Sequence, residues 1–540
     1  MSAREFDVVV IGGGHNGLVC AAYLAAAGAS VCVVERRHVV GGAAVTEEFH
    51  PGFRNSTASY TVSLLDPDVI RDLRLAHHGL TIIERPFANF LPLPQDRYLK
   101  VGGGLAATQA EVAKFSARDA ERLPQYYAML DRAAALLREL SRQTPPNIGA
   151  RGRQDLGALF DAWKAGRQFR KLDLGERRDL LDLMTKSAGD MLDRWFESEP
   201  IKAAFGFDSI VGNFASPYQP GSAYVLLHHV FGEVNGKRGQ WGHALGGMGA
   251  ITQAMAKECA ARGVDIRTGV GVKQVLVERV RACGVEVERG EAIRAKRVVA
   301  NVNPKLLFEQ LVPAEHVDAD FRARIASYRC GSGTFRMNVA LSELPDFSAL
   351  PGRAPQPHHA SGIIIGPSLR YMEQAYFDAR TDGWSRAPVV EMLIPSVVDP
   401  SLAPSGNHVA SLFCQHVHPR IADIHPGATW DDFRERVADL MIETVDRVAP
   451  NFKAAVIGRR ALTPLDLERE FGLIGGDIFH GALSLDQLFF ARPVLGNANY
   501  RMPVRGLYLC GSGAHPGGGV TGLPGRNAAR EIVRDIKRGR

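Results

Sequence analysis

The sequence predicts an α/β protein whose first unit is a Rossmann-like dinucleotide-binding domain. Residues 6–11 are apolar except for one Asp, as in a buried strand of a parallel sheet, and the glycine-rich turn 12–17 follows at once. Residues 18–28 then have the Ala-rich composition of a helix that ends at a glycine, and residues 31–34 form a second apolar run. Strand, glycine turn, helix and strand in this order predict a βαβ unit.

Each glycine of the turn has a mechanical role in such a unit. Gly12 permits the tight turn from strand to helix, Gly14 lets the backbone approach a diphosphate, and Gly17 lets the helix pack closely on the strand. The diphosphate then lies at the helix N-terminus, where free N–H groups favour an anion. Glu35 ends the second strand, where it is expected to accept hydrogen bonds from an unphosphorylated ribose. This acid favours FAD or NAD over NADP.

Length and composition indicate a folded protein with more than one domain. The 540 residues exceed what a single compact core usually holds. Hydrophobic residues make up 46% and charged residues 23%, which is ordinary for globular proteins. The formal charge of +6 is small for this length and is spread along the chain, so no nucleic-acid partner is expected.

The seven cysteines show neither a C-x-x-C nor a C-x4-C spacing. This excludes the sequence signatures of a redox-active dithiol and of a zinc site, and no metal is expected. A scattered, odd set fits a reducing compartment. The chain passes from residue 5 straight into a strand, so we expect no signal peptide, and the uncharged run 209–232 is too interrupted for a membrane span. We expect a cytoplasmic protein, soluble or peripheral to a membrane.

The pair Gly41-Gly42 follows the second strand, and this position distinguishes FAD from NAD. The arrangement resembles flavoproteins of the glutathione-reductase type, especially the amine-oxidase and phytoene-desaturase branch. In that branch the pair contacts the FAD diphosphate and the start of the ribityl chain. The resemblance therefore implies FAD.

The C-terminus resembles the same branch. Residues 505–511 are a short apolar strand, 512–522 a glycine-rich loop that contains HPGGGVTG, and 523–536 a helix. Strand, loop and helix again supply backbone donors for an anionic or carbonyl-rich ligand. The resemblance, here to bacterial-type phytoene desaturases and carotenoid isomerases, implies that the start of the loop touches the diphosphate or ribityl chain and that its end approaches the isoalloxazine.

A middle segment completes the resemblance, which covers essentially the whole chain. Residues 240–249 read QWGHALGGMG and precede a helix to about residue 262. The strands 274–280, 283–288 and 293–301 follow. In this superfamily, backbone groups near Val272 read the adenine. The glycines at 246–249 do not follow a strand, so we expect no second nucleotide domain for NAD(P)H. Pattern and resemblance together predict FAD contacts at Gly12, Gly14, His15, Asn16, Gly17, Glu35, Arg36, Gly41, Gly42, Ala43, Val272, Gly511, Ser512, Val520, Thr521 and Gly522.

The FAD-binding domain is thus expected to be interleaved with an α+β substrate domain. The predicted segments alternate between the two, with residues 1–104, 231–310 and 496–540 in the FAD-binding domain and residues 105–230 and 311–495 in the substrate domain. The stretch 142–171 carries seven Lys or Arg and two Asp. A solvated helix and loop face explains it better than contact with an anionic membrane, and both remain open, as does a homodimer.

Flavin chemistry needs no obvious acid–base motif, because the cofactor takes the hydride and the protein orients the substrate. Weak candidates are Ser56 and Thr57, which follow the Gly-Gly pair, Trp241 as a wall of the flavin, and His515 in the cofactor loop. A polar turn explains Ser56 and Thr57 equally well, and core packing explains Trp241 about as well. For His515, a ring that only hydrogen-bonds to backbone groups of the loop is the better explanation. The resemblance implies an FAD-dependent oxidoreductase acting on C–C bonds of an apolar, isoprenoid-like substrate, reoxidised by oxygen, a quinone or a protein. A flavin amine oxidase and an FAD-binding regulatory protein are the alternatives.

Overall fold

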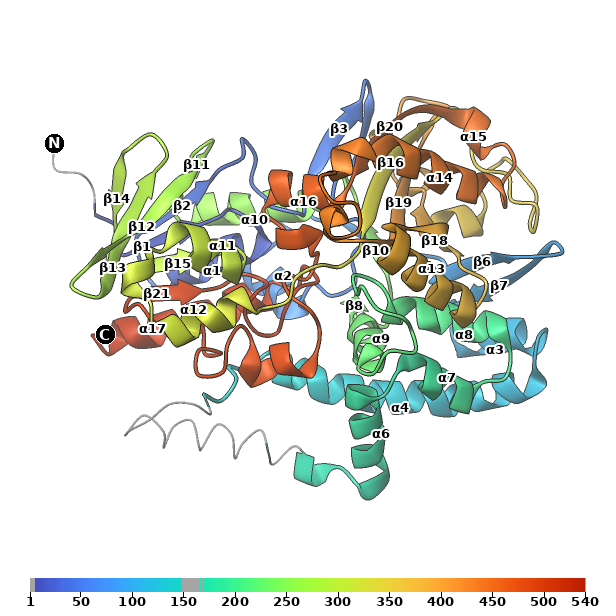
Figure 1. The fold of residues 1–540 in the computed structure, drawn as a ribbon, viewed down its shortest axis with the longest axis horizontal. Helices are drawn as coiled ribbons and strands as arrows, with labels where there is room; N and C mark the ends of the chain where they lie inside the picture. Colours follow the sequence, from blue (N-terminus) through green and yellow to red (C-terminus); the bar gives the residue numbers. More distant parts are fainter. Residues whose placement is uncertain (1–4, 148–165, 167–168, 540) are drawn as a thin grey trace.

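The computed structural model describes residues 5–147, 166 and 169–539, and two sheets organise it (Figure 1). The first is a parallel sheet of five strands in the order β11-β2-β1-β15-β21. Its strands are β1 (Val8–Ile11), β2 (Val31–Glu35), β11 (Asp265–Thr268), β15 (Val298–Ala300) and β21 (Leu507–Leu509). Three segments distant in sequence therefore meet in one sheet, and Figure 1 shows blue, yellow-green and red strands side by side.

Helix α1 (His15–Ala26) packs against both α10 (Met248–Ala261) and α17 (Leu523–Lys537). All three helices contribute buried side chains to the core that also holds β1 and β2. The predicted βαβ unit, the middle helix and the C-terminal helix are thus present, within a few residues of the predicted ends. The order of strands places the carboxyl ends of β1, β2 and β21 at one edge, where a ligand of a doubly wound sheet binds.

The predicted strand 293–301 is instead two strands in two sheets. The first part, β14 (Ala292–Arg294), pairs with β13 (Arg281–Val287), which pairs with β12 (Val272–Glu278). The second part is β15 of the parallel sheet. The chain changes sheets between them, which apolar patterning alone does not reveal.

The second large sheet has seven strands in the order β20-β16-β19-β18-β17-β6-β7. Its strands are β6 (Asn89–Leu93), β7 (Arg97–Val101), β16 (Phe335–Leu341), β17 (Gly362–Ile365), β18 (Trp384–Leu393), β19 (His408–Val417) and β20 (Val456–Leu462). The prediction that all of residues 1–104 belong to the FAD-binding domain is therefore wrong for β6 and β7. Residues 89 and 90 pair in parallel with residues 362 and 363, a contact across the chain that no local pattern encodes. The other predicted domain boundaries stay predictions.

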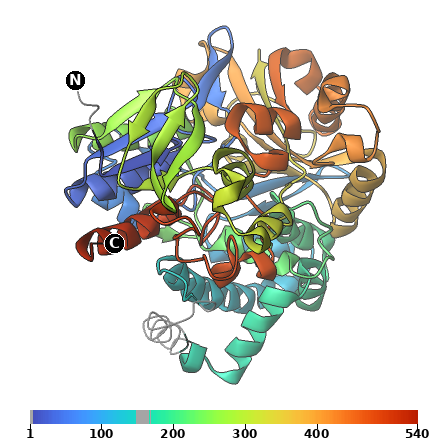
Figure 2. The same cartoon turned by 60° about the vertical axis from the view of Figure 1, so that its left-hand side comes forward.

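The seven-stranded sheet separates two apolar layers, because neighbouring residues point to opposite faces. Ile364 and Val389 pack with the helices of residues 105–230, whereas Ile363 and Val390 pack with α14 (Arg434–Asp446). The first layer comprises α3 (Leu105–Ala113), α4 (Ala117–Ser141), α6 (Leu174–Thr185), α7 (Ala188–Trp195), α8 (Glu199–Gly206) and α9 (Ser222–Val230). These teal and green helices lie in the lower part of the molecule in both views (Figure 2).

Further helices and strands pack around these sheets. They are β3 (Thr46–His50), β4 (Phe53–Ser56), α2 (Pro67–Asp72), β5 (Ile82–Glu84), β8 (Glu233–Val234), β9 (Lys237–Arg238), β10 (Gly242–Ala244), α11 (Pro304–Leu306), α12 (Ala319–Ala326), α13 (Leu369–Asp382), α15 (Phe452–Ala455) and α16 (Pro464–Phe471). None of the helices in the described part of the chain is both long and apolar enough to span a bilayer.

Candidate functional site

A cavity of about 420 Å³, here called the dinucleotide cavity, opens at the carboxyl ends of β1 and β2. It brings together ten of the residues predicted to contact FAD. They are Gly12, Gly14, His15, Glu35, Arg36, Gly41, Gly42, Ala43, Val272 and Ser512. Residues from the two ends of the chain thus face one space, as the sequence predicts.

The glycines of this cavity lie where a side chain has no room. A Cβ on Gly17 would lie 2.2 Å from the carbonyl oxygen of Gly12, and one on Gly14 would lie 2.9 Å from Nδ2 of Asn301. Gly42 approaches Gly14 so closely that its Cβ would lie 3.3 Å from the Gly14 Cα. Gly17 therefore acts through packing and does not line the cavity. The backbone of the turn is left bare toward the ligand, which is what an approaching diphosphate needs.

The carboxylate of Glu35 lines the cavity and hydrogen-bonds to two backbone amides. One carboxylate oxygen, Oε2, accepts a 2.7 Å hydrogen bond from the amide of Gly13, and the other, Oε1, accepts one of 2.8 Å from the amide of Arg37. The side chain is buried yet lines the cavity. Its position between the turn and the end of β2 is the one expected for a ribose acceptor.

Two imidazoles line the same cavity, and only one of them was predicted. Nε2 of His15 and Nδ1 of His480 are buried without a hydrogen-bond partner among the described residues. Burial lowers the pKa of His15 to about 4 and that of His480 to about 3, so both rings are neutral near pH 7. His480 follows α16 and lacks any motif, so sequence reasoning had no signal for it.

The remaining predicted contacts lie around the cavity. Nδ2 of Asn16 donates a 3.1 Å hydrogen bond to Oγ of Ser512, which ties the N-terminal turn to the C-terminal loop. Gly511 packs against Asn301, and a Cβ there would lie 3.1 Å from the Asn301 Oδ1. The end of the loop, Val520, Thr521 and Gly522, lies outside the dinucleotide cavity, and Thr521 lines a separate pocket described below.

Polar side chains of the seven-stranded sheet hold the loop that follows the Gly-Gly pair. Nδ2 of Asn338 donates to the carbonyl of Ser56 at 3.0 Å, and Nε of Arg336 donates to the carbonyl of Ala58 at 3.0 Å. The backbone of the loop also bonds to the cavity wall, because the amide of Ser59 donates to the carbonyl of Ala43. The two domains are therefore joined at this loop.

The weak catalytic candidates in this loop each form a side-chain hydrogen bond within the protein. Oγ of Ser56 accepts a 2.9 Å hydrogen bond from the amide of Met248, and Oγ1 of Thr57 donates to Glu47 at 3.1 Å. Both side chains are buried. These contacts give both residues a structural role, and their catalytic role stays a prediction.

The other two weak candidates, Trp241 and His515, lie outside the dinucleotide cavity. The Trp241 ring lies between the guanidinium of Arg85, 5.5 Å from the ring centroid, and the ring of His229, whose centroid is 6.4 Å away. Nε2 of His515 contacts the carbonyl of Leu140 at 3.1 Å, and burial lowers the pKa of His515 to about 4. Of the two, only His515 lines the apolar space between the helices and the C-terminal loop.

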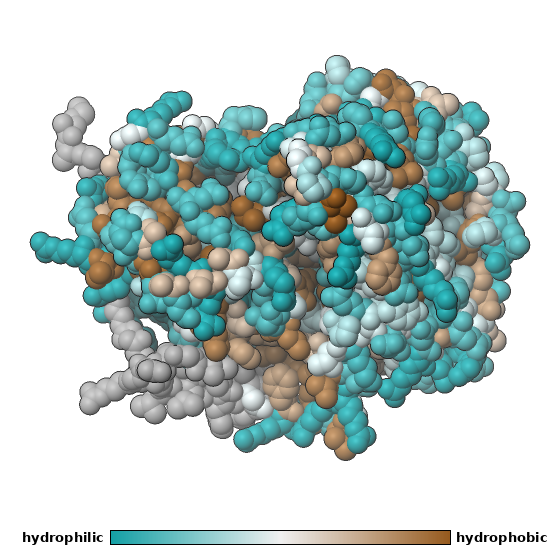
Figure 3. All heavy atoms as spheres, in the orientation of Figure 1, coloured by the Kyte–Doolittle hydropathy of each residue, from teal (hydrophilic) through white to brown (hydrophobic). Residues whose placement is uncertain are grey.

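That space consists of two pockets. The outer pocket, about 340 Å³, is lined by Leu137, Leu140, Gln143, Thr144, Pro145, Pro146, Gly166, Phe169, Leu180, Met184, Phe489, Phe490 and His515. The inner pocket, about 20 Å³, is lined by Leu137, Ser141, Tyr224, His228, Phe231, Phe489, His515, Pro516, Gly518, Thr521 and Leu523. Figure 3 shows apolar side chains gathered in the lower middle of the face, where Figure 1 draws α4. The pockets share a wall and lead from the helical layer to the C-terminal loop.

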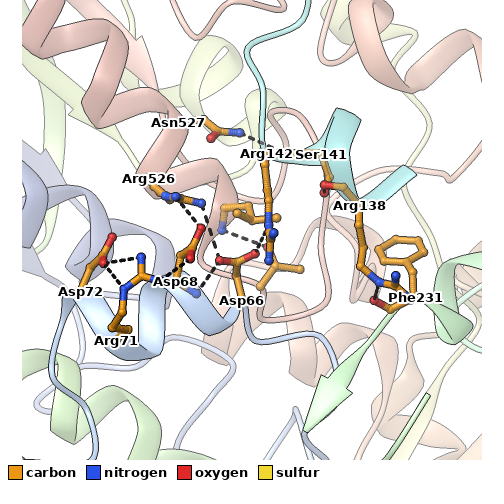
Figure 4. Close-up of polar contacts among 12 residues, drawn as sticks. Asp66, Asp68, Arg71, Asp72, Arg138, Ser141, Arg142, Phe231, Arg526 and Asn527 are labelled. Atoms are coloured by element: carbon orange, nitrogen blue, oxygen red, sulfur yellow. Dashed lines mark hydrogen bonds and ion pairs between the residues drawn. The ribbon is translucent and has the colours of Figure 1, made fainter. Parts of the chain in front are cut away.

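A cluster of ion pairs anchors this loop beside α4 (Figure 4). The amide of Asp66 donates to the carbonyl of Thr521 at 3.1 Å. The carboxylate of Asp66 accepts a 2.8 Å hydrogen bond from Arg142 at the end of α4 and lies 3.6 Å from Arg526 of α17, which also pairs with Asp68 at 2.8 Å. Three segments distant in sequence thus meet at Asp66. In the basic stretch 142–171, Arg142 is engaged here, while residues 148–165, 167 and 168 lie outside the described residues.

Comparison with known proteins identifies the family. The profile of flavin-containing amine oxidoreductases matches residues 17–334. The pyridine nucleotide-disulfide oxidoreductase domain-containing protein 2 of Rattus norvegicus is 43% identical, over 99% of this chain and 94% of its own length. The chain belongs to the flavin-containing amine oxidoreductase family. It is an FAD-dependent oxidoreductase, as its sequence predicts.

More distant relatives of this chain include a dehydrogenase subunit and a desaturase. A limonene dehydrogenase subunit of Castellaniella defragrans is 27% identical, over 99% of this chain and 95% of its own length. The lycopene-forming phytoene desaturase of Pseudescherichia vulneris is 25% identical, over 95% and 96%. A solved structure of putrescine oxidase has the same fold, with a TM-score of 0.61 at 15% identity and 99% coverage of both chains. The resemblance to the phytoene-desaturase and amine-oxidase branch is confirmed.

The residues of the dinucleotide cavity fit the FAD that the family implies. The bare glycine backbone provides a cradle that any Cβ would fill, and the half-buried His15 and His480 have ring nitrogens without partners among the described residues. Glu35 supplies a carboxylate at the ribose position. No metal is implied, and the described residues contain no cluster of metal-ligating side chains.

Proposed function

We propose that this flavoenzyme oxidises CH–CH bonds of a neutral, apolar substrate of the isoprenoid class. Its flavin would pass electrons to oxygen, a quinone or a protein acceptor. The observation that carries the proposal is the uncharged path from the outer pocket through the inner pocket to Thr521, because a polyene or terpene has no group that needs a countercharge.

None of the described residues that line the two pockets is Asp, Glu, Lys or Arg. The titratable groups of the inner pocket are uncharged as well. Burial raises the pKa of Tyr224 above its usual range, lowers that of His228 well below 6.5 and lowers that of His515 to about 4. An ammonium ion would lose its hydration here without gaining a carboxylate partner, which is costly. The pockets therefore favour a neutral ligand over an amine.

The names of two relatives also support an apolar hydrocarbon substrate. The limonene dehydrogenase subunit and the phytoene desaturase are named for terpenoid hydrocarbons, and each aligns with nearly the whole of this chain. Their identities of 27% and 25% make this supporting evidence for a substrate class and leave the individual substrate open.

In this proposal the predicted contacts hold FAD in an extended form. Gly12, Gly14 and Gly42 would cradle the diphosphate, Glu35 would accept from the ribose, and backbone groups near Val272 would read the adenine. Ser512 and Gly511 would contact the diphosphate or ribityl chain, and Val520, Thr521 and Gly522 the isoalloxazine. When bound, FAD supplies the hydride acceptor, and the protein orients the substrate and excludes water.

The test is anaerobic reduction of the purified holoprotein, followed by its visible spectrum. Limonene or a longer terpene is expected to bleach the FAD absorbance, and putrescine is expected to leave it unchanged. Bleaching by the amine alone would establish the flavin amine oxidase in its place. A protein that binds FAD and is bleached by neither class, nor by any of a panel of polyenes, would favour the regulatory alternative.

A further inference from the structure

One side chain, Phe489, separates the outer pocket from the inner pocket. It lines both, as do Leu137 and His515. Its ring lies 6.0 Å from the ring of His515 and 6.3 Å from that of Tyr224, measured between centroids. The ring therefore stands between the apolar space and the C-terminal loop.

The passage is closed in this conformation. The inner pocket has a volume of about 20 Å³, against about 340 Å³ for the outer pocket. A space of that size holds one water molecule and no carbon skeleton. A substrate that occupies the outer pocket must displace a side chain before it comes close to Thr521.

The backbone of Phe489 is strained. Its φ is +50°, in the left-handed region that a bulky side chain rarely adopts. Such backbone strain clusters at ligand clamps and switch regions. Phe489 begins the short 3-10 helix η11 (Phe489–Ala491), and its side chain is only half-buried, so rotation does not require the core to open.

The next residue provides a natural comparison. Phe490 lines the outer pocket alone and is 43% exposed. Phe489 lines both pockets and Phe490 lines only the outer one, so a change at Phe490 alters the outer pocket alone.

We propose that the outer pocket is a binding site for the hydrocarbon chain of an apolar substrate, and that the Phe489 side chain gates passage from it to the inner pocket. This rests on the proposed function, which it deepens. The reacting end of the substrate enters past Phe489 while the rest of the molecule stays among Leu180, Met184 and Phe490. Substrates with a chain long enough to fill both spaces are the class that the site selects.

The experiment compares FAD-loaded wild type with F489A, F489W and F490A. Nile red reports occupancy of the outer pocket by its fluorescence, and limonene is expected to displace it. In F490A, the loss of apolar contact is expected to weaken Nile red binding about fivefold. This change leaves the passage as it is.

The gate is measured by anaerobic stopped-flow mixing with limonene, followed as the perturbation of the FAD absorbance when the hydrocarbon arrives beside the flavin, with or without reduction. Removal of the gating ring in F489A is expected to speed the spectral change about tenfold, as for a lid that limits entry. F489W is expected to slow it. A further variant, L485A, changes an exposed residue that lines neither pocket and is expected to leave the rate unchanged. Because F489W adds volume and keeps an aromatic ring, it tests the gate even if F489A folds poorly, which circular dichroism would reveal.

Equal rates in wild type, F489A and F489W would overturn the gate. Nile red that limonene does not displace, or that binds F490A as tightly as wild type, would overturn the binding site. Failure of the proposed function gives a different result from failure of the gate. In that case the Phe489 and Phe490 variants behave as expected, but no hydrocarbon reduces the FAD anaerobically.

Discussion

The hydroxyl of Tyr60 donates a 2.5 Å hydrogen bond to Oε2 of Glu391. The Tyr60 ring stacks on that of Phe413, with 5.3 Å between the centroids, and its centroid lies 4.3 Å from the guanidinium carbon of Arg336. Arg336, Phe413 and Glu391 are register neighbours on β16, β19 and β18, so the ring spans a row of three strands. Tyr60 therefore fixes the end of the loop that begins beside the dinucleotide cavity.

Tyr60→Phe tests this anchor. The change keeps the ring and its packing but leaves the buried Glu391 without its phenol donor. A lost hydrogen bond to a charged group costs about 1.5–3 kcal/mol of unfolding free energy, measured by urea denaturation. The matched control is Tyr371→Phe, whose hydroxyl donates to the neutral carbonyl of Pro388 at 3.0 Å and whose loss costs about 1 kcal/mol. Equal losses in the two variants would contradict the role of the charge.

Asp66→Asn tests the ion-pair cluster of Figure 4. The side chains of Asp66 and Arg526 are buried. Without the negative charge of Asp66, Arg142 loses its carboxylate partner, whereas Arg526 keeps its ion pair with Asp68. Breaking a buried pair costs about 3 kcal/mol of unfolding free energy.

FAD affinity is expected to fall with it, because the side-chain ion pairs of Asp66 hold α17, which follows the C-terminal loop, beside the end of α4. The control is Asp182→Asn, whose partners Lys186 and Arg194 are exposed and whose loss is expected to cost less than about 1 kcal/mol. If Asp66→Asn loses no more stability than this control, the cluster does not anchor the loop.

Local patterns were enough to predict the parallel sheet and most of the cavity. The turn at Gly12–Gly17, the end of β2 and the Gly41-Gly42 pair are contiguous with the elements that position them, so spacing encodes their geometry. The C-terminal strand, loop and helix are likewise one continuous segment. These residues reach the cavity without any information about distant contacts.

The residues that sequence reasoning missed reach the site from far along the chain. Asn301 donates to the carbonyl of Gly12 at 3.1 Å and blocks any Cβ on Gly14, yet it lies just beyond β15 with no motif around it. His480 enters the cavity from the substrate part of the chain. Phe489 acquires its place from the packing of α4, α9 and the C-terminal loop. Only tertiary contacts define these positions.

Glu35→Gln tests the predicted ribose contact. The amide keeps one acceptor oxygen for the turn but loses the charge that strengthens a hydrogen bond to a ribose hydroxyl. A loss of about 1.5–3 kcal/mol corresponds to a roughly tenfold to hundredfold larger FAD dissociation constant, measured by quenching of flavin fluorescence. Glu278→Gln, on an exposed carboxylate of β12 that pairs with Arg294, is the control and is expected to leave the constant unchanged. An unchanged affinity in Glu35→Gln would place the ribose elsewhere.

The raised pKa of Asp208 predicts that the protein loses stability as the pH rises, which is the reverse of the usual effect of a carboxyl group. Burial, then the nearby negative charge of Glu391, raise the pKa of Asp208 from 3.8 to about 8, against the opposing effect of Arg85. Near it also lie Tyr126 and Tyr127, which are uncharged at these pH values because burial raises their pKa. The attraction of Arg85 is too weak to offset the cost of burying a charged carboxylate, so the neutral form of Asp208 is favoured.

The native state therefore holds one proton more than the unfolded state between pH 3.8 and about 8. Because the pKa is raised on folding, the stabilisation is fully present below pH 3.8 and is lost as the pH rises through 8. Over that window the unfolding free energy of the wild type is expected to fall by up to about 1.4 kcal/mol per pH unit from this group. Asp208→Asn cannot ionise, so its advantage over the wild type in urea unfolding should grow from about pH 5.5 to about pH 8 at about that slope.

Asp7→Asn is the control for this slope, because the pKa of Asp7 is shifted in the opposite direction. Hydrogen bonds from Lys296 and Ser30 lower the pKa of Asp7 from 3.8 to about 2. Its carboxylate is ionised in both the folded and the unfolded state above about pH 5.5, so the stability difference between Asp7→Asn and the wild type should stay constant up to about pH 8. A constant difference for Asp208→Asn as well would show that Asp208 is ionised in the folded protein. The interior between the sheet and the helices would then hold two negative charges beside Arg85 in place of one.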